Sequence, residues 1–422
     1  MKRHSLVFSL LMAIVAAVGK GAPPQEEGKL EQLRGELARL RSELEEAKAS
    51  YDRRISLLEG RLAELRPAAE PEPIAASGAA GASAQAAPAR DVTFSGGERN
   101  LQKLNPEISV TGDVSARYSD DSRNPGYNRL NFDGFEMGIQ HPLDPYSQAK
   151  FFIIFEDGEF GLEEGYISWE SLPGNLGLKV GRFHGSFGKL NRYHKHALPW
   201  VDRDLPTRTF FGGEGLIGDG LSLSWLPPRL PFAQTNEVYF EVINNSNDRA
   251  FSGRGFGDPV YLARLLSYYD VTDAAYFEWG LSAATSHWDP QQKNRSTVFG
   301  LDLSYRWQPP RRALYRSFEL RGELFYNDRR SAPGGDPWGL YVSGEHQLDR
   351  RWFAGLRYQF AKTLLDTSQH TSFYSPFLTF WQSEFVRLRA QYDFLDKNFE
   401  KDENRFSIQF TWSLGPHKHE AY

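Results

Sequence analysis

The sequence has no cysteine among its 422 residues, which excludes disulfides, thiolate metal sites, iron–sulfur clusters, a cysteine nucleophile and a lipid-modified cysteine. It also lacks the repeated apolar runs, each of about 20 residues, that a bundle of membrane helices needs. The 49 basic and 54 acidic residues nearly balance, so nothing points to nucleic acid as a partner. Aromatic residues make up 14% of the chain, too many for a disordered protein. We therefore expect a large, folded and mostly β chain.

Residues 1–19 have the pattern of a secretory signal peptide. Lys2 and Arg3 precede an apolar run from Leu6 to Val18, and small residues follow this run. The run is too short for a membrane anchor, which needs roughly 20 residues. We expect this segment to direct the chain across a bacterial inner membrane and then to be removed.

Residues 25–66 have the heptad pattern of a coiled coil. Leucines recur at positions 30, 33, 37, 40 and 44, and the spacing of three and four continues to Leu65, with one stutter between Tyr51 and Ile55. A seam of this length favours a self-associating helix over a helix that packs on its own domain. Leucine at both seam positions leaves the number of helices open. Residues 67–103 follow as an Ala- and Pro-rich linker without periodicity.

From residue 104 to residue 422, apolar and polar residues alternate in short segments. In Phe299–Trp307, for example, Phe, Leu, Leu, Tyr and Trp alternate with Gly, Asp, Ser and Arg. Sixteen such segments are centred near residues 113, 136, 153, 166, 178, 222, 239, 264, 280, 302, 320, 342, 356, 377, 390 and 409. The longer segments have the length of tilted strands that cross a bilayer. The fold class expected for residues 104–422 is all-β, an antiparallel transmembrane barrel of about 16 strands.

Two further patterns favour a membrane barrel over a soluble β-sandwich. Most connections after odd-numbered segments are long and polar, whereas most of those after even-numbered segments are short; the connection near Glu156–Glu159 breaks this rule. Tryptophans at segment ends would form an aromatic girdle at one, periplasmic, rim. These tryptophans are Trp169, Trp225, Trp307, Trp352 and Trp412.

Three stretches of the sequence resemble bacterial outer-membrane porins. They are LNPEISVTGDVSARY at 104–118, GRFHGSFGKLNRYHKHALPWVDRDLP at 181–206 and FSIQFTWSLGPH at 406–417. They look in particular like the phosphate-selective porin-like family, whose members often carry an N-terminal coiled coil. The resemblance implies a trimeric channel of sixteen strands for small solutes. We expect the barrel to lie in the bacterial outer membrane and the N-terminal region in the periplasm. It leaves the solute open.

The inner face of such a barrel is expected to be polar and wet, so lumen charges and any inward-folded loop would determine what passes. The connection from about Phe183 to Gly218 is the longest, and its apolar residues favour packing inside the lumen as a constriction. Its candidate charged residues are Lys189, Arg192, Asp202, Arg203, Asp204 and Arg208. The candidate pore-lining residues on strands are Arg182, Arg306, Arg321, Arg357, Arg387, Arg389, Asp302, Glu319 and Glu323. The sequence leaves open whether the arginines form an anion-binding cluster, with Arg387 and Arg389 the best candidates, or pair with carboxylates across the lumen.

Two histidine pairs have a spacing that suits a Zn or Cu site in an extended segment. One is His194 with His196, and the other is His417 with His419 near the end of the chain. The more common alternative is histidines that are solvated or packed within a loop. No Gly-x-Ser-x-Gly motif is present, and we expect neither enzymatic activity nor a cofactor.

We predict a porin for the passive diffusion of small hydrophilic solutes or ions, which forms a homotrimer surrounded by outer-membrane lipid. The alternative is a structural anchor, whose coiled coil links the outer membrane to the cell wall or to another periplasmic partner. The two functions differ in whether the lumen is open.

Overall fold

The computed structural model describes Gly35, which is helical, and residues 106–415 except 125, 157, 229–232, 246–248, 253–254, 256, 290 and 330–333. The chain divides into two units, Met1–Phe94 and Ser95–Tyr422, and the second unit contains every described strand. Apart from Gly35, the predicted signal peptide, coiled coil and linker lie outside the described residues. Within the described part of the chain, no helix is long and apolar enough to cross a membrane.

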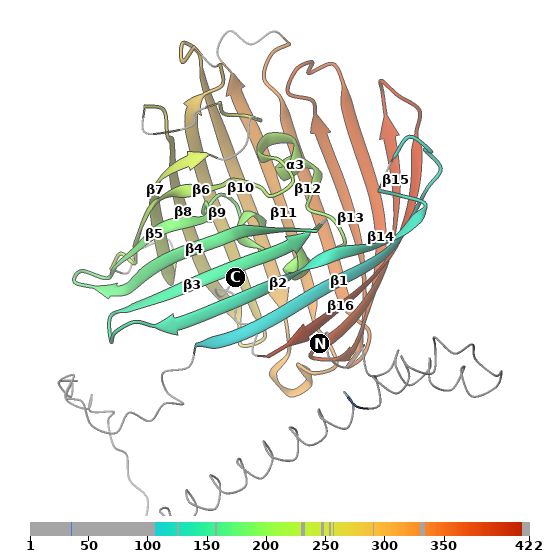
Figure 1. Ribbon diagram of the computed structural model, residues 1–422, viewed down its shortest axis with the longest axis horizontal. Coiled ribbons are helices and arrows are strands. Elements are labelled where there is room, and N and C mark those ends of the chain that lie inside the picture. Colours follow the sequence, from blue (N-terminus) through green and yellow to red (C-terminus); the bar gives the residue numbers. More distant parts are fainter. Residues whose placement is uncertain are drawn as a thin grey trace, which may run out of the picture. The chain divides into compact units, whose positions relative to one another are not determined.

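Sixteen antiparallel strands form a closed barrel, in which β16 pairs with β1 to complete the wall (Figure 1). The strands are β1 (Glu107–Ser119), β2 (Arg129–Pro142), β3 (Ser147–Glu156), β4 (Glu159–Leu172), β5 (Leu176–His184), β6 (Ile217–Trp225), β7 (Thr235–Asn245), β8 (Val260–Thr272), β9 (Ala275–His287), β10 (Arg295–Trp307), β11 (Phe318–Arg329), β12 (Trp338–Gln347), β13 (Trp352–Lys362), β14 (His370–Ser383), β15 (Val386–Lys397) and β16 (Glu403–Leu414). Each predicted segment corresponds to one of them. The predicted all-β barrel of sixteen strands is therefore confirmed.

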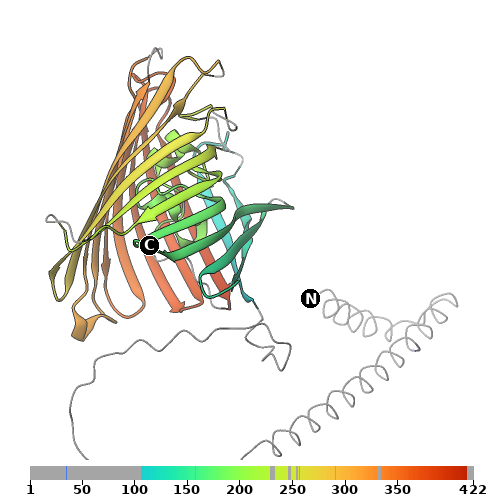
Figure 2. The ribbon, with the colours of Figure 1, turned by 90° about the vertical axis from the view of Figure 1, so that its left-hand side faces the viewer.

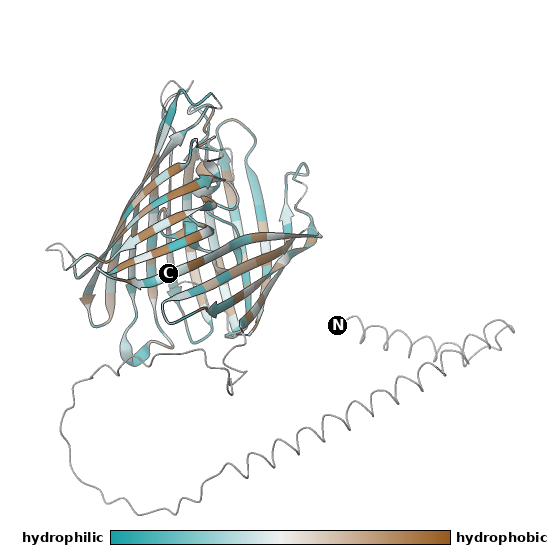
Figure 3. Ribbon diagram, turned by 60° about the vertical axis from the view of Figure 1, so that its left-hand side comes forward, coloured by the Kyte–Doolittle hydropathy of each residue, from teal (hydrophilic) through white to brown (hydrophobic). Residues whose placement is uncertain are grey.

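The alternation of residue types places apolar side chains on the outer face of the wall. In β10, Leu301 and Leu303 are 37% and 43% exposed, whereas Asp302 between them is 2% exposed and faces inward. The register places Leu301 beside Leu281 of β9 and Leu324 of β11, so apolar side chains continue around the wall, and the bands alternate in colour along each strand in Figure 3. An apolar outer face on a closed sheet matches lipid, because no strand edge is left unpaired.

The two rims of the barrel carry different connections. Connections 173–175, 273–274 and 384–385 follow even-numbered strands and are short; we call this end the turn rim. The other end, the loop rim, has most of the long connections. All five predicted girdle tryptophans lie at the turn rim. Trp225 and Trp307 end β6 and β10, Trp352 begins β13, and Trp169 and Trp412 lie close to the ends of β4 and β16.

The first testable prediction concerns the outer apolar belt. The substitution Leu301→Arg should destabilise the barrel by about 2–4 kcal/mol, because it places a charge in the hydrocarbon layer. Leu365→Arg makes the same exchange in the connection 363–369, where the side chain is 83% exposed, and should change stability by less than about 0.5 kcal/mol. Denaturant unfolding in lipid vesicles measures both. Equal effects of the two substitutions would contradict the assignment of β10 to the bilayer.

Candidate functional site

The segment between β5 and β6, residues 185–216, lies inside the barrel (Figures 1 and 2). We call it the inner loop. It contains two short 3-10 helices, η2 (Leu190–Arg192) and η3 (Lys195–Ala197), and one α-helix, α3 (Leu205–Phe211). Trp200 is fully buried against Tyr341 of β12, with ring centroids 5.4 Å apart. The longest predicted connection is therefore a packed internal segment.

Arginines of the barrel wall donate hydrogen bonds to backbone carbonyls of the inner loop. The pairs are Arg264 with Gly188, Arg357 with Asp202 at 3.2 Å, Arg387 with His196 at 2.7 Å and Arg389 with Leu198 at 3.1 Å. All four guanidinium groups are buried. Because a buried carbonyl without a donor is costly, these arginines stabilise an irregular backbone that has no ladder of its own. The two best anion-binding candidates of the sequence are thus engaged with the loop.

Wall carboxylates and amides complement the arginines by accepting from backbone N–H groups of the inner loop. Glu241 accepts from Ser186 at 2.9 Å, Glu323 from Lys189 and Leu190 at 3.2 and 2.9 Å, Gln391 from Val201 at 3.0 Å and Gln359 from Leu205 at 2.6 Å. These partners come from β7, β11, β13 and β15, which lie on different sides of the lumen. The path of the loop is therefore specified by the wall.

One side of the inner loop packs in a hydrophobic core inside the barrel. Phe187, Phe210 and Phe211 are fully buried in this core together with inward-facing Val298 and Phe325. The rings of Phe210 and Phe325 stack with centroids 5.7 Å apart. The expectation of a polar inner face is therefore wrong for this part of β8–β11. Apolar residues face inward there because loop side chains, rather than water, cover them.

Charged residues of the inner loop are paired rather than free. Arg203 donates to the carbonyls of Leu190, Tyr193 and Gly213, and so fastens the loop to itself. Burial lowers the pKa of Lys189, but Glu278, 2.9 Å from its Nζ, raises it above the usual value. These residues have structural roles in addition to any role in the lumen.

The remaining loop candidates lie beside other charges or aromatic rings. Burial raises the pKa of Asp202, but Arg208, Arg117 and Arg357 together hold it below its usual range. Arg192 and Arg208 lie over the rings of Tyr239 and Phe373, each 5.8 Å from the ring centroid. The Asp204 carboxylate caps α3 by accepting from the Thr207 N–H at 2.8 Å.

Most of the predicted pore-lining residues face inward and lie close to opposite charges. Arg321 contacts Glu319 at 2.5 Å, Arg264 contacts Asp302 at 2.9 Å, and Arg357 lies 3.8 Å from Asp393. Arg306 is exposed on the inward side of β10 near the turn rim, in register with Glu319. These pairs join residues of one strand or of nearby strands, so they are not the pairs across the lumen that the sequence left open.

Arg182 does not line the lumen, in contrast to the expectation. It pairs in register with Asp219, and this pair follows the outward-facing pair Val180 and Leu221 two positions along. The Arg182 guanidinium lies 3.3 Å from the Asp219 carboxylate, which is 67% exposed. Gly181 adopts φ 140° between the two pairs. Arg182 thus continues the outward face of Val180, and strict alternation along β5 already places it outside the lumen.

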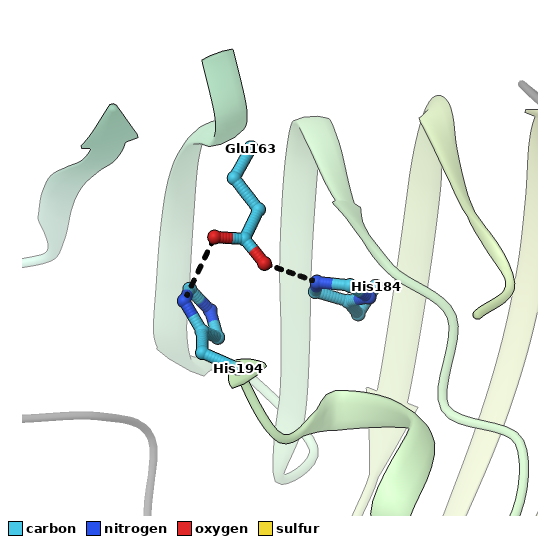
Figure 4. Close-up of side chains that lie close together, drawn as sticks. All are labelled: Glu163, His184 and His194. Atoms are coloured by element: carbon cyan, nitrogen blue, oxygen red, sulfur yellow. Dashed lines mark hydrogen bonds and ion pairs between the residues drawn. The ribbon is translucent and has the colours of Figure 1, made fainter. Parts of the chain in front are cut away.

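His194 of the inner loop lies among three buried glutamates. Its Nδ1 is 2.7 Å from Glu136 and 3.5 Å from Glu163, and its Nε2 is 2.9 Å from Glu164. Burial lowers the pKa of His194, but Glu163 and Glu136 more than offset this effect and hold it well above its usual value. His184, at the end of β5, contacts Glu163 from the other side at 3.4 Å (Figure 4).

The sequence predicted that His194 and His196 would share a site, but the structure places His194 closer to other residues. His196 lies near the same cluster, 3.4 Å from Glu136, but its ring centroid is 6.0 Å from that of His194. Outside the loop, His194 lies beside His184, Glu136, Glu163 and Glu164, and Phe152 packs on its ring. The sequence pattern singled out none of these residues. The Glu163–Glu164 pair was the available signal, since adjacent glutamates interrupt the alternation of β4. His417 and His419 lie outside the described residues.

No protein-family model matches the sequence. An uncharacterised protein of Aquifex aeolicus is 28% identical over 335 residues, which cover 69% of each chain. Among solved structures, the chain is similar to OprB of Pseudomonas putida (11% identity, TM-score 0.54, 74% of this chain and 95% of that chain) and to the outer membrane channel DcaP of Acinetobacter baumannii (12%, 0.51, 74% and 96%). It is also similar to the trimer form of OmpT, an outer membrane protein of Vibrio cholerae (10%, 0.50, 74% and 99%). The chain therefore has the fold of bacterial outer-membrane porins.

The second prediction concerns the cap of α3. Asp204→Ala should lower the local stability of α3 by about 0.5–2 kcal/mol, because the Thr207 N–H loses its acceptor. Asp204→Ser retains a capping oxygen and should have a clearly smaller effect. Hydrogen exchange of residues 205–211 in the detergent-solubilised protein measures the difference. Equal exchange in the two variants would show that the cap does not stabilise the helix.

Proposed function

We propose that this protein is an outer-membrane channel for the passive diffusion of small hydrophilic solutes or ions, and that its inner loop is the constriction. The observation that carries the proposal is the position of this loop inside a closed barrel, hydrogen-bonded to wall residues on several sides. A solute that crosses the barrel has to pass between the loop and the wall. Because the wall fixes the loop backbone, the aperture has a defined size.

Cavities between the inner loop and the wall support a path for solutes. A cavity of about 850 Å³ opens near the turn rim beside Arg192. A second one, of about 530 Å³, lies beside His196 and Arg387. The charged residues of the larger cavity are Lys150, Lys179 and Arg192 together with Glu107, Glu170 and Glu237. Three basic and three acidic groups in this cavity favour weak charge selectivity. The assignment to the phosphate-selective family is supported by the sequence resemblance alone.

The contacts of the inner loop also support a second candidate, a barrel that serves as a structural anchor. A loop bonded to wall residues on several sides is what a closed lumen requires. In this function the predicted coiled coil of residues 25–66 would reach a periplasmic partner such as the cell wall. At about 1.5 Å per residue, a helix from Leu30 to Leu65 would extend roughly 55 Å.

The third prediction separates the two functions. In planar bilayers, a channel gives discrete conductance steps, and replacing residues 189–214 with a short Gly/Ser linker should increase the step several-fold, since the constriction is removed. The control replaces residues 399–401 between β15 and β16 with Gly-Ser-Gly, and it should conduct like the unmodified protein. A silent unmodified protein with a conducting loop variant would support the anchor. Equal conductance of the unmodified protein and the loop variant would contradict the constriction.

We further propose that the N-terminal region, after removal of the signal peptide, lies in the periplasm and gathers the barrels into a homotrimer. The heptad seam of residues 25–66 supports association, and a trimer form is known for the similar barrel of Vibrio cholerae OmpT. A parallel coiled coil would place its barrels around one axis.

The fourth prediction tests this role. Deletion of residues 20–90 should weaken the oligomer without unfolding the barrel, because β1–β16 close the wall without this segment. Mass determination of the detergent-solubilised protein measures the oligomer, and heat-modifiable migration on gels reports the folded barrel. An unchanged oligomer would show that the barrel wall, rather than the coiled coil, holds the copies together.

A further inference from the structure

The histidine–glutamate cluster between the inner loop and the wall has the composition of a metal site. Donor atoms of Glu163, His184 and His194 all lie within 4.8 Å of one another (Figure 4). Glu163 lies between the two rings, with one carboxylate oxygen 3.4 Å from His184 Nε2 and the other 3.5 Å from His194 Nδ1. Ligands of a tetrahedral zinc ion are separated by about 3.4 Å when the bonds are about 2.1 Å long. Small side-chain movements would therefore close the site.

A β-bulge in β4 places two adjacent glutamates on the same side of the wall, whereas regular alternation would place only one of them there. The register of β3 and β4 shifts at Phe152 and Ile153, which pair with Glu164 and Leu162, so Glu163 is the extra residue of a β-bulge. The bulge lets Glu163 and Glu164 both face the lumen, where each is buried. Bulges of this kind re-aim side chains and are over-represented beside functional sites.

The cluster has more acceptors than donors. Glu136 and Glu163 both approach Nδ1 of His194, at 2.7 and 3.5 Å, and ionised carboxylates have no proton to share with each other. The Glu136 carboxylate is 4% exposed, and its Oε1 has no hydrogen-bond partner among the described residues. Three buried carboxylates, on Glu136, Glu163 and Glu164, lie beside the imidazoles of His184 and His194, and His196 lies 3.4 Å from Glu136. A cation stabilises buried negative charge, and a divalent ion supplies more positive charge than one protonated ring.

We propose that this cluster binds one Zn²⁺ ion through His184, His194 and Glu163. The ion would lie on the Nδ1 side of His194, in place of the proton now shared with Glu136. Glu164 would remain on Nε2, 2.9 Å away, and fix the ring orientation, as outer carboxylates do for zinc-bound histidines. Glu136 is placed to provide an oxygen as the fourth ligand. Two imidazoles and a carboxylate form a donor set that is typical of zinc.

The ion would connect the inner loop to the wall. His194 belongs to the loop, whereas Glu163 and His184 belong to β4 and β5. Elsewhere the wall holds the loop through hydrogen bonds and ion pairs, such as that of Lys189 with Glu278, but here it would hold a loop side chain through a metal bond. Zinc binding would therefore fix the position of the loop next to η3.

The fifth prediction tests this site on the untagged full-length protein in detergent. All samples carry His417→Gln and His419→Gln, which remove the other histidine pair. After treatment with EDTA, competition with a zinc-binding dye should reveal one tightly bound zinc per chain. His184→Gln and Glu163→Gln should each weaken binding by at least about 100-fold, and Glu164→Gln by about 10–100-fold. Cobalt in place of zinc should give the absorption of a four- or five-coordinate ion with imidazole ligands.

The control is His287→Gln, which removes a histidine bonded to Asp258 at 2.7 Å, away from the cluster, and should bind zinc like the parent. Heat-modifiable migration selects folded variants, and the three substitutions at different residues keep the test independent of any one that misfolds. A parent that binds no zinc at micromolar concentrations would overturn the proposal. Unchanged binding by folded His184→Gln or Glu163→Gln would overturn it as well. The test does not depend on conductance.

Discussion

The interior of this barrel depends on one constraint: the irregular backbone of the inner loop needs hydrogen-bond partners. The wall satisfies its own backbone through sixteen antiparallel strands, but the inner loop has only short helices of its own. Its carbonyls and N–H groups are matched by inward side chains of the wall. Arg357 and Gln359, two positions apart on β13, donate to Asp202 and accept from Leu205. Lumen side chains thus continue the hydrogen-bonding role that the strand ladder has in the wall.

Because the loop backbone needs hydrogen-bond partners, charged residues of the lumen serve to hold the loop rather than only to attract solutes. A row of arginines in a porin-like sequence suggests an anion path, yet Arg387 and Arg389 are buried and bind carbonyls of the loop. Burial of a guanidinium is tolerated because it donates in several directions at once, and nearby carboxylates offset its charge. In the proposed channel, selectivity would depend on the residues that remain beside the cavities, such as Arg192 and Glu237.

The sequence predicted the wall well and the interior less well. The period-two pattern located all sixteen strands, the girdle tryptophans and the long connection. It predicted that apolar loop residues pack, and Trp200 and Phe210 are fully buried. It misplaced Arg182, and it did not find Arg264, Gln359 or the glutamates around His194. Arg264, Gln359 and these glutamates contact residues that are distant in the sequence. One of the glutamates, Glu163, faces inward only because of a bulge.

The sequence by itself determined the class of fold, because strand alternation and turn chemistry are local properties that each segment carries without its neighbours. It also determined that one long connection had to be packed, since its apolar side chains could not remain in water. Only the tertiary structure decided which wall residues meet that connection. Closure of the barrel brings strands distant in the chain around one lumen, and the position of the inner loop selects which inward side chains it contacts. The cluster of His184, His194 and Glu163 forms because the inner loop, which follows β5, turns back beside the paired strands β4 and β5.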